Sequence, residues 1–287
     1  MKIMTRISRW KWFITFFFVA ILYEPKIFAQ TIQPSYYDQN MLVIPEGQSR
    51  TFMFTNRKGL FYYGETGLPN TSPLNGLSYL THKFLEDYII EIGGSPLSRA
   101  QAEAHLMANR LVRHFKNLSV EEEISIADSL LALIIKIRGP QKAPLAIAPL
   151  ISSANEKQHF QVDWSQSDRI LFISRANLAT SSDKNPPAWL AITTYPEGDF
   201  SSLEIEKLPI QSKLSRQPNF CPGKIHVLLD SEVIILFIVG NNKNELLKSR
   251  NLMLKQLNIE IRRKNDRIEG IRETQLFLST WLALSTL

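Results

Sequence analysis

The residues best suited to acid–base chemistry are the consecutive carboxylates Glu121, Glu122 and Glu123. Two carboxylates catalyse glycoside hydrolysis when they face each other across a cleft, roughly 5–10 Å apart. Neighbouring side chains on a β-strand instead point to opposite faces of the sheet. We therefore predict that this run forms a solvated strand face and provides no catalytic pair. Glu86 and Asp87 are separated in the same way.

The histidines and the cysteine show no spacing that is typical of a metal or nucleophile site. No two histidines have HxH or HExxH spacing, and the chain lacks GxSxG, P-loop and GxGxxG motifs. The single cysteine, Cys221, lies in a turn-like Asn-Phe-Cys-Pro-Gly context without an adjacent base. We expect no cofactor, no metal and no catalytic residue in this chain. The histidines are His82, His105, His114, His159 and His226.

Aromatic residues are the remaining candidates, because aromatic faces stack on the apolar C–H surfaces of sugar rings. Tyr62 and Tyr63 are neighbours on an expected strand, so one of the two rings should face outward. Core or inter-sheet packing is the alternative for each aromatic residue, including Tyr79 and Trp164. The predicted substrate-binding set adds polar side chains from the stretch after the tyrosines, and consists of Tyr62, Tyr63, Asn75, His82 and Trp189.

The elements that would position these residues are short β-type runs separated by turn signals. This pattern, without βαβ alternation, predicts a mainly β fold: a large antiparallel β-sandwich (supersandwich) over residues 30–242. Residues 64–76 contain Pro69 and Pro73 and are expected to form an ordered loop, and residues 97–105 a short helix. The expected strands are 41–45, 50–55, 60–63, 77–92 (a strand pair or one bent strand), 111–115, 121–126, 130–137, 145–148, 160–164, 170–174, 189–194 and 225–239.

A C-terminal amphipathic helix is predicted to follow the sandwich. Leu247, Leu254, Ile261 and Ile268 recur every seven residues among charged neighbours, which favours a helix over 243–274. It would pack one stripe on its neighbour or lead, as a linker, to a further domain. Residues 275–287 are apolar and uncharged. We interpret them as a truncated or aberrant tail, because such a segment would promote aggregation when exposed.

The N-terminus is typical of a secretory signal peptide over residues 1–29. A basic segment precedes a short apolar core, and we predict cleavage after Ala29 in a bacterial cell, with a periplasmic or secreted product. An uncleaved signal anchor is the alternative, because Ile27 is large for its position. Without these residues the chain has 28 basic and 26 acidic residues, a net charge of +2. We therefore expect no nucleic-acid partner and, after cleavage, no stable membrane anchor.

Several segments resemble the N-terminal domain of bacterial amylo-α-1,6-glucosidases, the glycogen debranching enzyme-like proteins. The resemblance spans roughly residues 41–272 and lies in loose sequence patterns, without a catalytic signature. It is carried by Gly59–Gly64 (GLFYYG), Thr71–Gly76 (TSPLNG), His82–Asp87 (HKFLED), Glu122–Leu130 (EEISIADSL), Pro144–Pro149 (PLAIAP), and the strand end Val239–Gly240 before a long charged helix.

The resemblance implies a β-sandwich, linker helices and an α/α toroid that contains the catalytic carboxylates. This chain ends at the helix, so no catalytic residue can be transferred to it. We therefore expect a non-catalytic domain, inactive alone, that packs on a missing toroid and shapes its cleft for α-glucans. A free-standing carbohydrate-binding or surface interaction module is the alternative. A third possibility is an intact enzyme with an unrecognised site.

Overall fold

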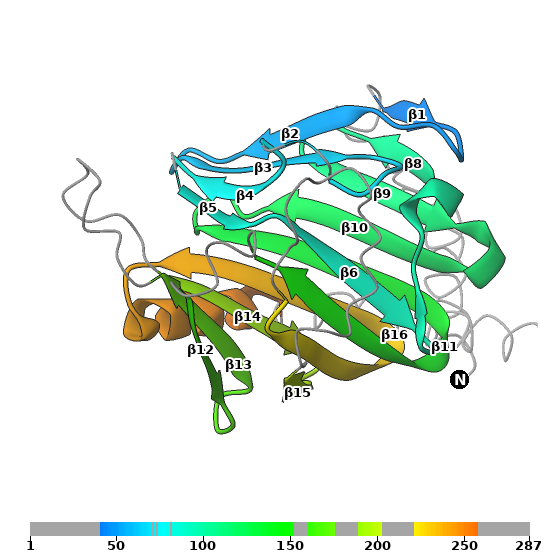
Figure 1. Ribbon diagram of the computed structural model, residues 1–287. Coiled ribbons are helices and arrows are strands. Elements are labelled where there is room, and N and C mark those ends of the chain that lie inside the picture. The colour runs from blue at the N-terminus through cyan, green and yellow to red at the C-terminus, as the bar shows by residue number, and fades with distance from the viewer. Residues whose placement is uncertain are drawn as a thin grey trace, which may run out of the picture. The chain divides into compact units, whose positions relative to one another are not determined.

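The alternating pattern of the sequence corresponds to two antiparallel sheets, shown in Figure 1. The computed structural model describes residues 41–70, 72, 74–80, 82–151, 160–175, 189–202 and 221–257. All the strands in these ranges belong to one compact unit that begins at Leu42. The mainly β fold with a large sandwich and a helix after its last strand is confirmed. The expected signal peptide and the 275–287 tail lie outside the described residues.

The large sheet contains twelve strands within the described residues. Nine follow the order β1-β8-β9-β10-β11-β16-β14-β13-β12, β15 pairs with β16, and β6 pairs with β11 and β7. They are β1 (Leu42–Ile44), β6 (Asp87–Ile92), β7 (Ser95–Pro96), β8 (Glu103–Leu106), β9 (Arg110–Phe115), β10 (Val120–Ile126), β11 (Ala132–Leu150), β12 (Phe160–Ser165), β13 (Ile170–Arg175), β14 (Trp189–Tyr195), β15 (Asp199–Ser202) and β16 (Gly223–Gly240).

The long strands β11 and β16 form the centre of this sheet. They pair along most of their length, with an irregularity between Gly139 and Ala143. Before this bulge β11 also pairs with β10, and after it with β6. The bulge therefore divides the large sheet into two halves: one continues through β10, β9 and β8, and the other through β6 and β7. The predicted strands 130–137 and 145–148 are therefore parts of the single strand β11, which continues across the bulge.

The small sheet packs on the inner face of the large one. It has the order β2-β3-β4-β5 and contains β2 (Thr51–Thr55), β3 (Leu60–Glu65), β4 (Gly76–Tyr79) and β5 (His82–Leu85). Its Phe52, Leu60 and Leu77 share one buried cluster with Ile135 and Phe237 of the large sheet. Burying these apolar side chains between the sheets is the main favourable contribution to folding. Residues 77–92 thus form three strands, not the expected pair or single strand.

The outer face of the large sheet is covered at one end by helix 243–257. Asn242 caps this helix by accepting a hydrogen bond from the Glu245 amide, 3.0 Å. Leu246, Met253 and Leu257 pack on sheet residues in a second buried cluster. The buried stripe is therefore displaced by one residue from the predicted Leu247 and Leu254, which are half-buried. The continuation to residue 274 lies outside the described residues.

The expected helix at 97–105 is wrong. The structure has a single 3₁₀ turn, η1 (Arg99–Gln101), followed directly by strand β8. Local helix propensity is a weak preference, and here pairing of β8 with β1 and β9 outweighs it. No helix in the described part of the chain combines the length and apolar character needed to cross a membrane.

Candidate functional site

The candidate site is a groove on the outer face of the half-sheet formed by β6, β11, β16 and β15. The strand registers place Glu91, Ala146, His226 and Asp199 opposite one another in a single row. Directly paired residues in antiparallel strands point to the same face. Their neighbours along the strands, such as Ile225 and Val227, point into the core. The groove therefore lies on the face opposite the core.

The groove forms because its central strand carries small side chains. Pro144 and Ala146 on β11, together with Gly94, leave a cavity of about 590 Å³ between larger residues of β6, β15 and β16. This volume lies within the range of about 300–1,000 Å³ for small-molecule sites. Leu228, 52% exposed, is the large apolar side chain at its margin.

Each carboxylate that lines the groove is paired with a cation. Lys224 Nζ lies 2.7 Å from Glu91 Oε1, and Arg250 of helix 243–257 lies 2.7 Å from Glu197 Oε1. Asp199 forms an ion pair with Arg169. These carboxylates therefore act as counterions of neighbouring side chains.

Glu91 and Asp199 lie in one row on the outer face, on β6 and β15, three strand spacings apart. At the usual spacing their Cα atoms are about 14 Å apart. Both carboxylates are paired with cations, Glu91 with Lys224 and Asp199 with Arg169. The groove therefore presents ion-paired charges on both of its sides.

Ser201 and His226 form the one contact in the groove that resembles a nucleophile–base pair. Ser201 Oγ and His226 Nε2 are 2.7 Å apart. Nucleophilic catalysis also requires a group that orients the histidine and donors for an oxyanion. Among the described residues no carboxylate hydrogen bonds to His226, and both partners are exposed. We interpret the contact as a cross-strand hydrogen bond on the sheet surface.

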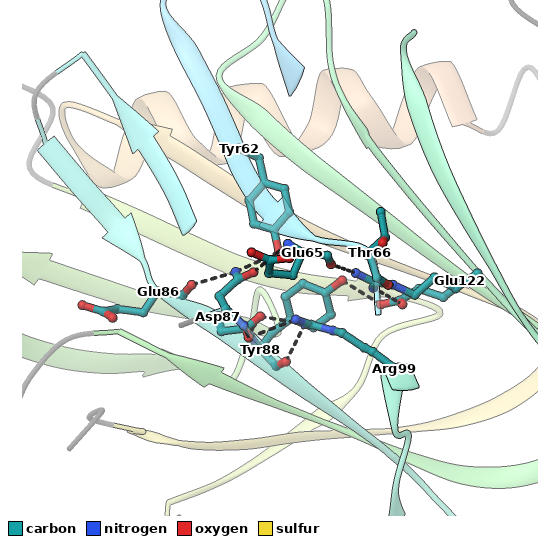
Figure 2. Close-up of polar contacts among 10 residues, drawn as sticks. Tyr62, Glu65, Thr66, Glu86, Asp87, Tyr88, Arg99 and Glu122 are labelled. Atoms are coloured by element: carbon teal, nitrogen blue, oxygen red, sulfur yellow. Dashed lines mark hydrogen bonds and ion pairs between the residues drawn. The ribbon is translucent and has the colours of Figure 1, made fainter. Parts of the chain in front are cut away.

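A second polar region lies between the two sheets and is buried (Figure 2). Arg99 donates two hydrogen bonds to Asp87, at 2.6 and 3.0 Å, and a third to the Tyr88 carbonyl at 3.1 Å. Asp87 also accepts from the backbone amides of Asn70, 2.8 Å, and Tyr88, 2.9 Å. The bidentate pair and the two amides together saturate the buried carboxylate.

Glu122 and Arg113 form the other part of this buried cluster. Arg113 Nη1 donates to Glu122 Oε2 at 2.5 Å, and the Tyr88 hydroxyl donates to Glu122 Oε1 at 2.7 Å. Arg113 also donates to the carbonyls of Thr66 and Glu65, both at 2.7 Å. Arg113 is 0% exposed and Glu122 is 2% exposed. These bonds fix the end of β3 to strands β6, β9 and β10.

The electrostatics of the cluster keep its groups in their bonded forms. Burial raises the pKa of Glu122, but the charges of Arg113 and Arg99 and the Tyr88 hydrogen bond more than offset this, so the pKa is lowered. Burial and the charge of Asp87 raise the pKa of Tyr62 to about 12. The pKa of Tyr88 is also raised, mainly by burial and then by Glu122. We interpret the cluster as structural, because its groups are saturated and closed to solvent.

The prediction that Glu121, Glu122 and Glu123 form a solvated face is wrong for Glu122. Alternation along β10 directs Glu122 inward to Arg113, whereas Glu121 and Glu123 lie on the outer face with Arg138. The prediction also missed Asp87, Arg99 and Arg113 as partners. The sequence did contain a signal: strand alternation directs one Arg of β9 and one Glu of β10 toward the core, and buried charges require a partner.

The five predicted substrate-binding residues do not form one site. Tyr62 is 0% exposed, part of the core, and its hydroxyl lies 3.4 Å from Asn70 Nδ2. Tyr63 is half-buried and offers the more accessible ring of the two. Trp189 lies on the outer face of β14, where Lys243 sits 5.4 Å from its ring centroid. Sugar binding by these residues stays a prediction.

Asn75 and His82 are both buried in the small sheet or at its margin. Neither the amide nitrogen nor the amide oxygen of Asn75 has a hydrogen-bond partner among the described residues. His82 begins β5, opposite Tyr79. They lie near the tyrosines in the small sheet, whereas Trp189 belongs to the large sheet and contacts the helix side. The structure therefore places four of the five predicted residues in the small sheet or at its margin.

Cys221 is buried and does not resemble a catalytic thiol. Burial raises its pKa to about 11, although a hydrogen bond with the Gly223 carbonyl and the charge of Lys224 act in the opposite direction. A reactive cysteine requires a lowered pKa. This residue is therefore a packing residue at the start of β16.

Comparison with known proteins finds similarity only in solved structures. No protein-family model matches the chain, and no curated protein sequence matches it. A heparinase III structure aligns with 8% identity and a TM-score of 0.39, over 70% of this chain and 37% of that one. The family GH92 α-mannosidase of Bacteroides thetaiotaomicron aligns with 12% identity and a TM-score of 0.37, over 76% and 32% of the two chains.

A second family GH92 structure from the same organism, an inverting mannosidase, aligns with 13% identity and a TM-score of 0.35, over 71% of this chain and 29% of that one. This chain therefore spans about a third of the length of these proteins. At such identities and TM-scores the similarity does not assign the chain to either family.

Proposed function

We propose that this chain is the non-catalytic β-sandwich domain of a secreted glycoside hydrolase of the glycogen-debranching type. In this proposal it packs against an α/α-toroid catalytic domain and shapes a cleft for α-glucans. The observation that carries the proposal is that each carboxylate lining the groove in the described part of the chain is paired with a cation. Such groups suit a contact surface better than an acid–base site.

Two further observations support the proposal. The segments that resemble debranching-type N-terminal domains include most of β3, all of β5 and the last third of β11. The β11 segment, Pro144–Pro149, provides the small residues that hollow the groove. One of the segments that carry the resemblance therefore also lines the groove.

Association with the toroid tests the proposal. The reading frames adjacent to this chain are searched for an α/α toroid, that domain is mixed with the chain, and complex formation is measured by sedimentation velocity. We expect Leu228→Asp, in the groove, to weaken association at least about tenfold. Leu118→Asp provides the matched control, because Leu118 is similarly exposed, at 54%, on the distant turn η2 (Lys116–Leu118). Absence of a complex, or equal weakening by both variants, contradicts the proposal.

A free-standing carbohydrate-binding module is the second candidate, and the groove itself favours it. A cavity of about 590 Å³ lined by Glu91, Asp199 and His226 offers polar groups that suit sugar hydroxyls. Affinity electrophoresis on immobilised α-glucans separates the possibilities. If the His226→Ala variant is no longer retarded by the glucan, sugar binds in the groove. If only the Tyr63→Ala variant loses this retardation, sugar binds on the small sheet. Equal migration with and without glucan removes this candidate.

A further inference from the structure

Two histidines form a cross-strand contact near one edge of the large sheet. Strand β8 lies between β9 and β1, and β1 pairs only with β8 among the described strands. His105 of β8 and His114 of β9 lie on the same face, because Glu103, two residues before His105, is directly opposite His114. The ring centroids are 4.5 Å apart in an edge arrangement. The two imidazoles therefore connect the last strands of the sheet through their side chains.

The ring nitrogens of this pair are arranged to hold one proton more than two neutral imidazoles hold. His105 Nε2 lies 3.0 Å from Glu103 Oε1, and His114 Nδ1 lies 3.5 Å from Glu121 Oε2. Because an ionised carboxylate only accepts hydrogen bonds, both of these outer nitrogens carry a proton. The inner nitrogens, His105 Nδ1 and His114 Nε2, face each other at 3.3 Å. Their contact is attractive only when one of them donates to the other, so the pair shares one additional proton.

A second additional proton breaks this arrangement. It occupies the nitrogen that accepts the inner hydrogen bond, so that two N–H groups and two positive charges face each other. Burial and the charge of His105 lower the pKa of His114, and the charges of Glu121 and Glu103 act in the opposite direction without outweighing them. This is the direction that repulsion between the two rings requires.

The charged side chains around the pair favour one additional proton over two. Lys116 lies 2.9 Å from Glu103, and Arg138 lies 2.6 Å from Glu121, so both carboxylates nearest the rings are already shared with cations. On β1 the residue opposite His105 is the uncharged Val43. The network has four negative and three positive side chains, so one additional proton makes it neutral and a second makes it positive. Its members are Glu103 of β8, Lys116 of η2, Glu121 and Glu123 of β10, Lys136 and Arg138 of β11, and Glu232 of β16.

We propose that His105 and His114 form a pH-sensitive latch that holds β8, and through it β1, on the edge of the large sheet. The latch is closed while the pair shares one additional proton, and it is weakened when both rings are charged. Strands β8 and β1 have only four and three residues, so this contact is a large part of what fixes them. Ala104 and Ile44 keep the inner face of these strands in the core. The second proton therefore loosens the edge without unfolding the sandwich.

The direction of the pH effect follows from the same contact. When the edge opens, the two rings separate, so the open form binds the second proton more readily than the closed form. The contribution of the latch is therefore complete above the ordinary histidine pKa of 6.5 and is lost as pH falls through the lower pKa of His114 in the closed form. Each unit by which that pKa is lowered corresponds to about a tenfold change in the ratio of closed to open edge.

Hydrogen–deuterium exchange of the full chain tests the proposal. Exchange of the β8 and β1 amides is compared between wild type and His114→Gln at each pH from about 7.5 to about 4.5, which removes the intrinsic pH dependence of exchange. Glutamine keeps a hydrogen-bonding side chain but takes up no proton. We expect the ratio of the wild-type rate to the variant rate to rise about tenfold as pH falls. His226→Gln, which changes the groove histidine, is the matched control and should exchange like wild type.

The imidazole ¹⁵N shifts of the wild-type chain keep the test decisive if the variant fails to fold. His105 and His114 should take up their two additional protons in two separate steps, and the β8 amide resonances should follow the second step. Uptake of both protons in a single step overturns the proposal. An exchange ratio that does not change with pH, or that changes equally with His226→Gln, overturns it as well.

Discussion

The cluster between the sheets and the groove on the outer face use the same kinds of side chain in opposite ways. In the cluster, Arg113 and Glu122 are buried, and Arg113 makes three hydrogen bonds at 2.5–2.7 Å. In the groove, Lys224 and Glu91 are partly exposed and form one ion pair. Removing a partner from a buried pair leaves a charge without compensation, whereas water can replace a partner at the surface. The presence of charged side chains therefore does not by itself mark a functional site in this protein.

The buried cluster also connects the small sheet to the large one. Glu65, Thr66 and Asn70 connect the small sheet to Asp87 and Arg113 through backbone groups as well as side chains. The groove has no comparable connections between sheets. We therefore assign a stabilising role to the cluster, whereas contact of the groove with other molecules is a proposal.

The largest expected difference is between Arg113→Met and Lys224→Met. The first leaves Glu122 buried without its cation and should lower the free energy of unfolding by about 3–5 kcal/mol. The second leaves Glu91 in contact with water and should cost about 1 kcal/mol or less. Urea unfolding curves of both variants measure the difference. Similar costs would remove the distinction between cluster and groove.

Two glycines extend the comparison between cluster and groove to the space available around the backbone. A Cβ at Gly76 (φ 114°), in strand β4 of the small sheet, would lie 2.0 Å from the Leu85 carbonyl oxygen, whereas a Cβ at Gly94 (φ 82°), in the groove, would meet nothing within 4 Å. Gly76→Ala should destabilise by about 2–4 kcal/mol through strain and overlap, and Gly94→Ala by about 1 kcal/mol through backbone strain alone. Thermal unfolding compares them. An equal loss in both would show that the groove is as tightly packed as the cluster side.

The pH dependence of stability tests the state of Glu122. Its pKa is lowered in the folded protein, so its contribution is complete above the unfolded pKa near 4.5 and is lost as pH falls through the lower folded pKa. The stability gap between wild type and Glu122→Gln should therefore shrink as pH falls from about 6 to about 3. Urea midpoints at several pH values measure this gap. A gap that stays constant would show that Glu122 is not ionised in the fold.

The smallest expected effect concerns the two tyrosines. Tyr62→Phe removes a phenol whose pKa is raised to about 12. Its contribution is present below the unfolded pKa near 10 and is lost as pH rises toward the folded value. The variant should therefore resist alkaline unfolding slightly better than wild type between about pH 10 and 12. Circular dichroism across this range measures it, with Tyr63→Phe as the half-buried control. Better resistance with Tyr63→Phe than with Tyr62→Phe would contradict the burial assignment.

Much of the fold could be predicted from alternation in the sequence. Runs such as 50–55 and 189–194 correspond to β2 and β14, because the first alternates and the second is rich in apolar and β-branched residues. The expected helix at 97–105 failed because strand pairing outweighed the helical propensity of its alanines. The groove could not be predicted, because Glu91, Ala146 and His226 meet only through the registers of distant strands. The inward direction of Glu122 required knowing which face of β10 meets the small sheet.

Sugar release by the purified chain tests the central claim most directly. The chain and its Glu91→Gln/Asp199→Asn variant are incubated with glycogen, pullulan and linear maltooligosaccharides, and reducing ends are counted. Because the groove carboxylates are paired with cations, we predict no release above that of the variant. Release by the wild-type chain that disappears in the variant would contradict the assignment of the groove as a non-catalytic surface.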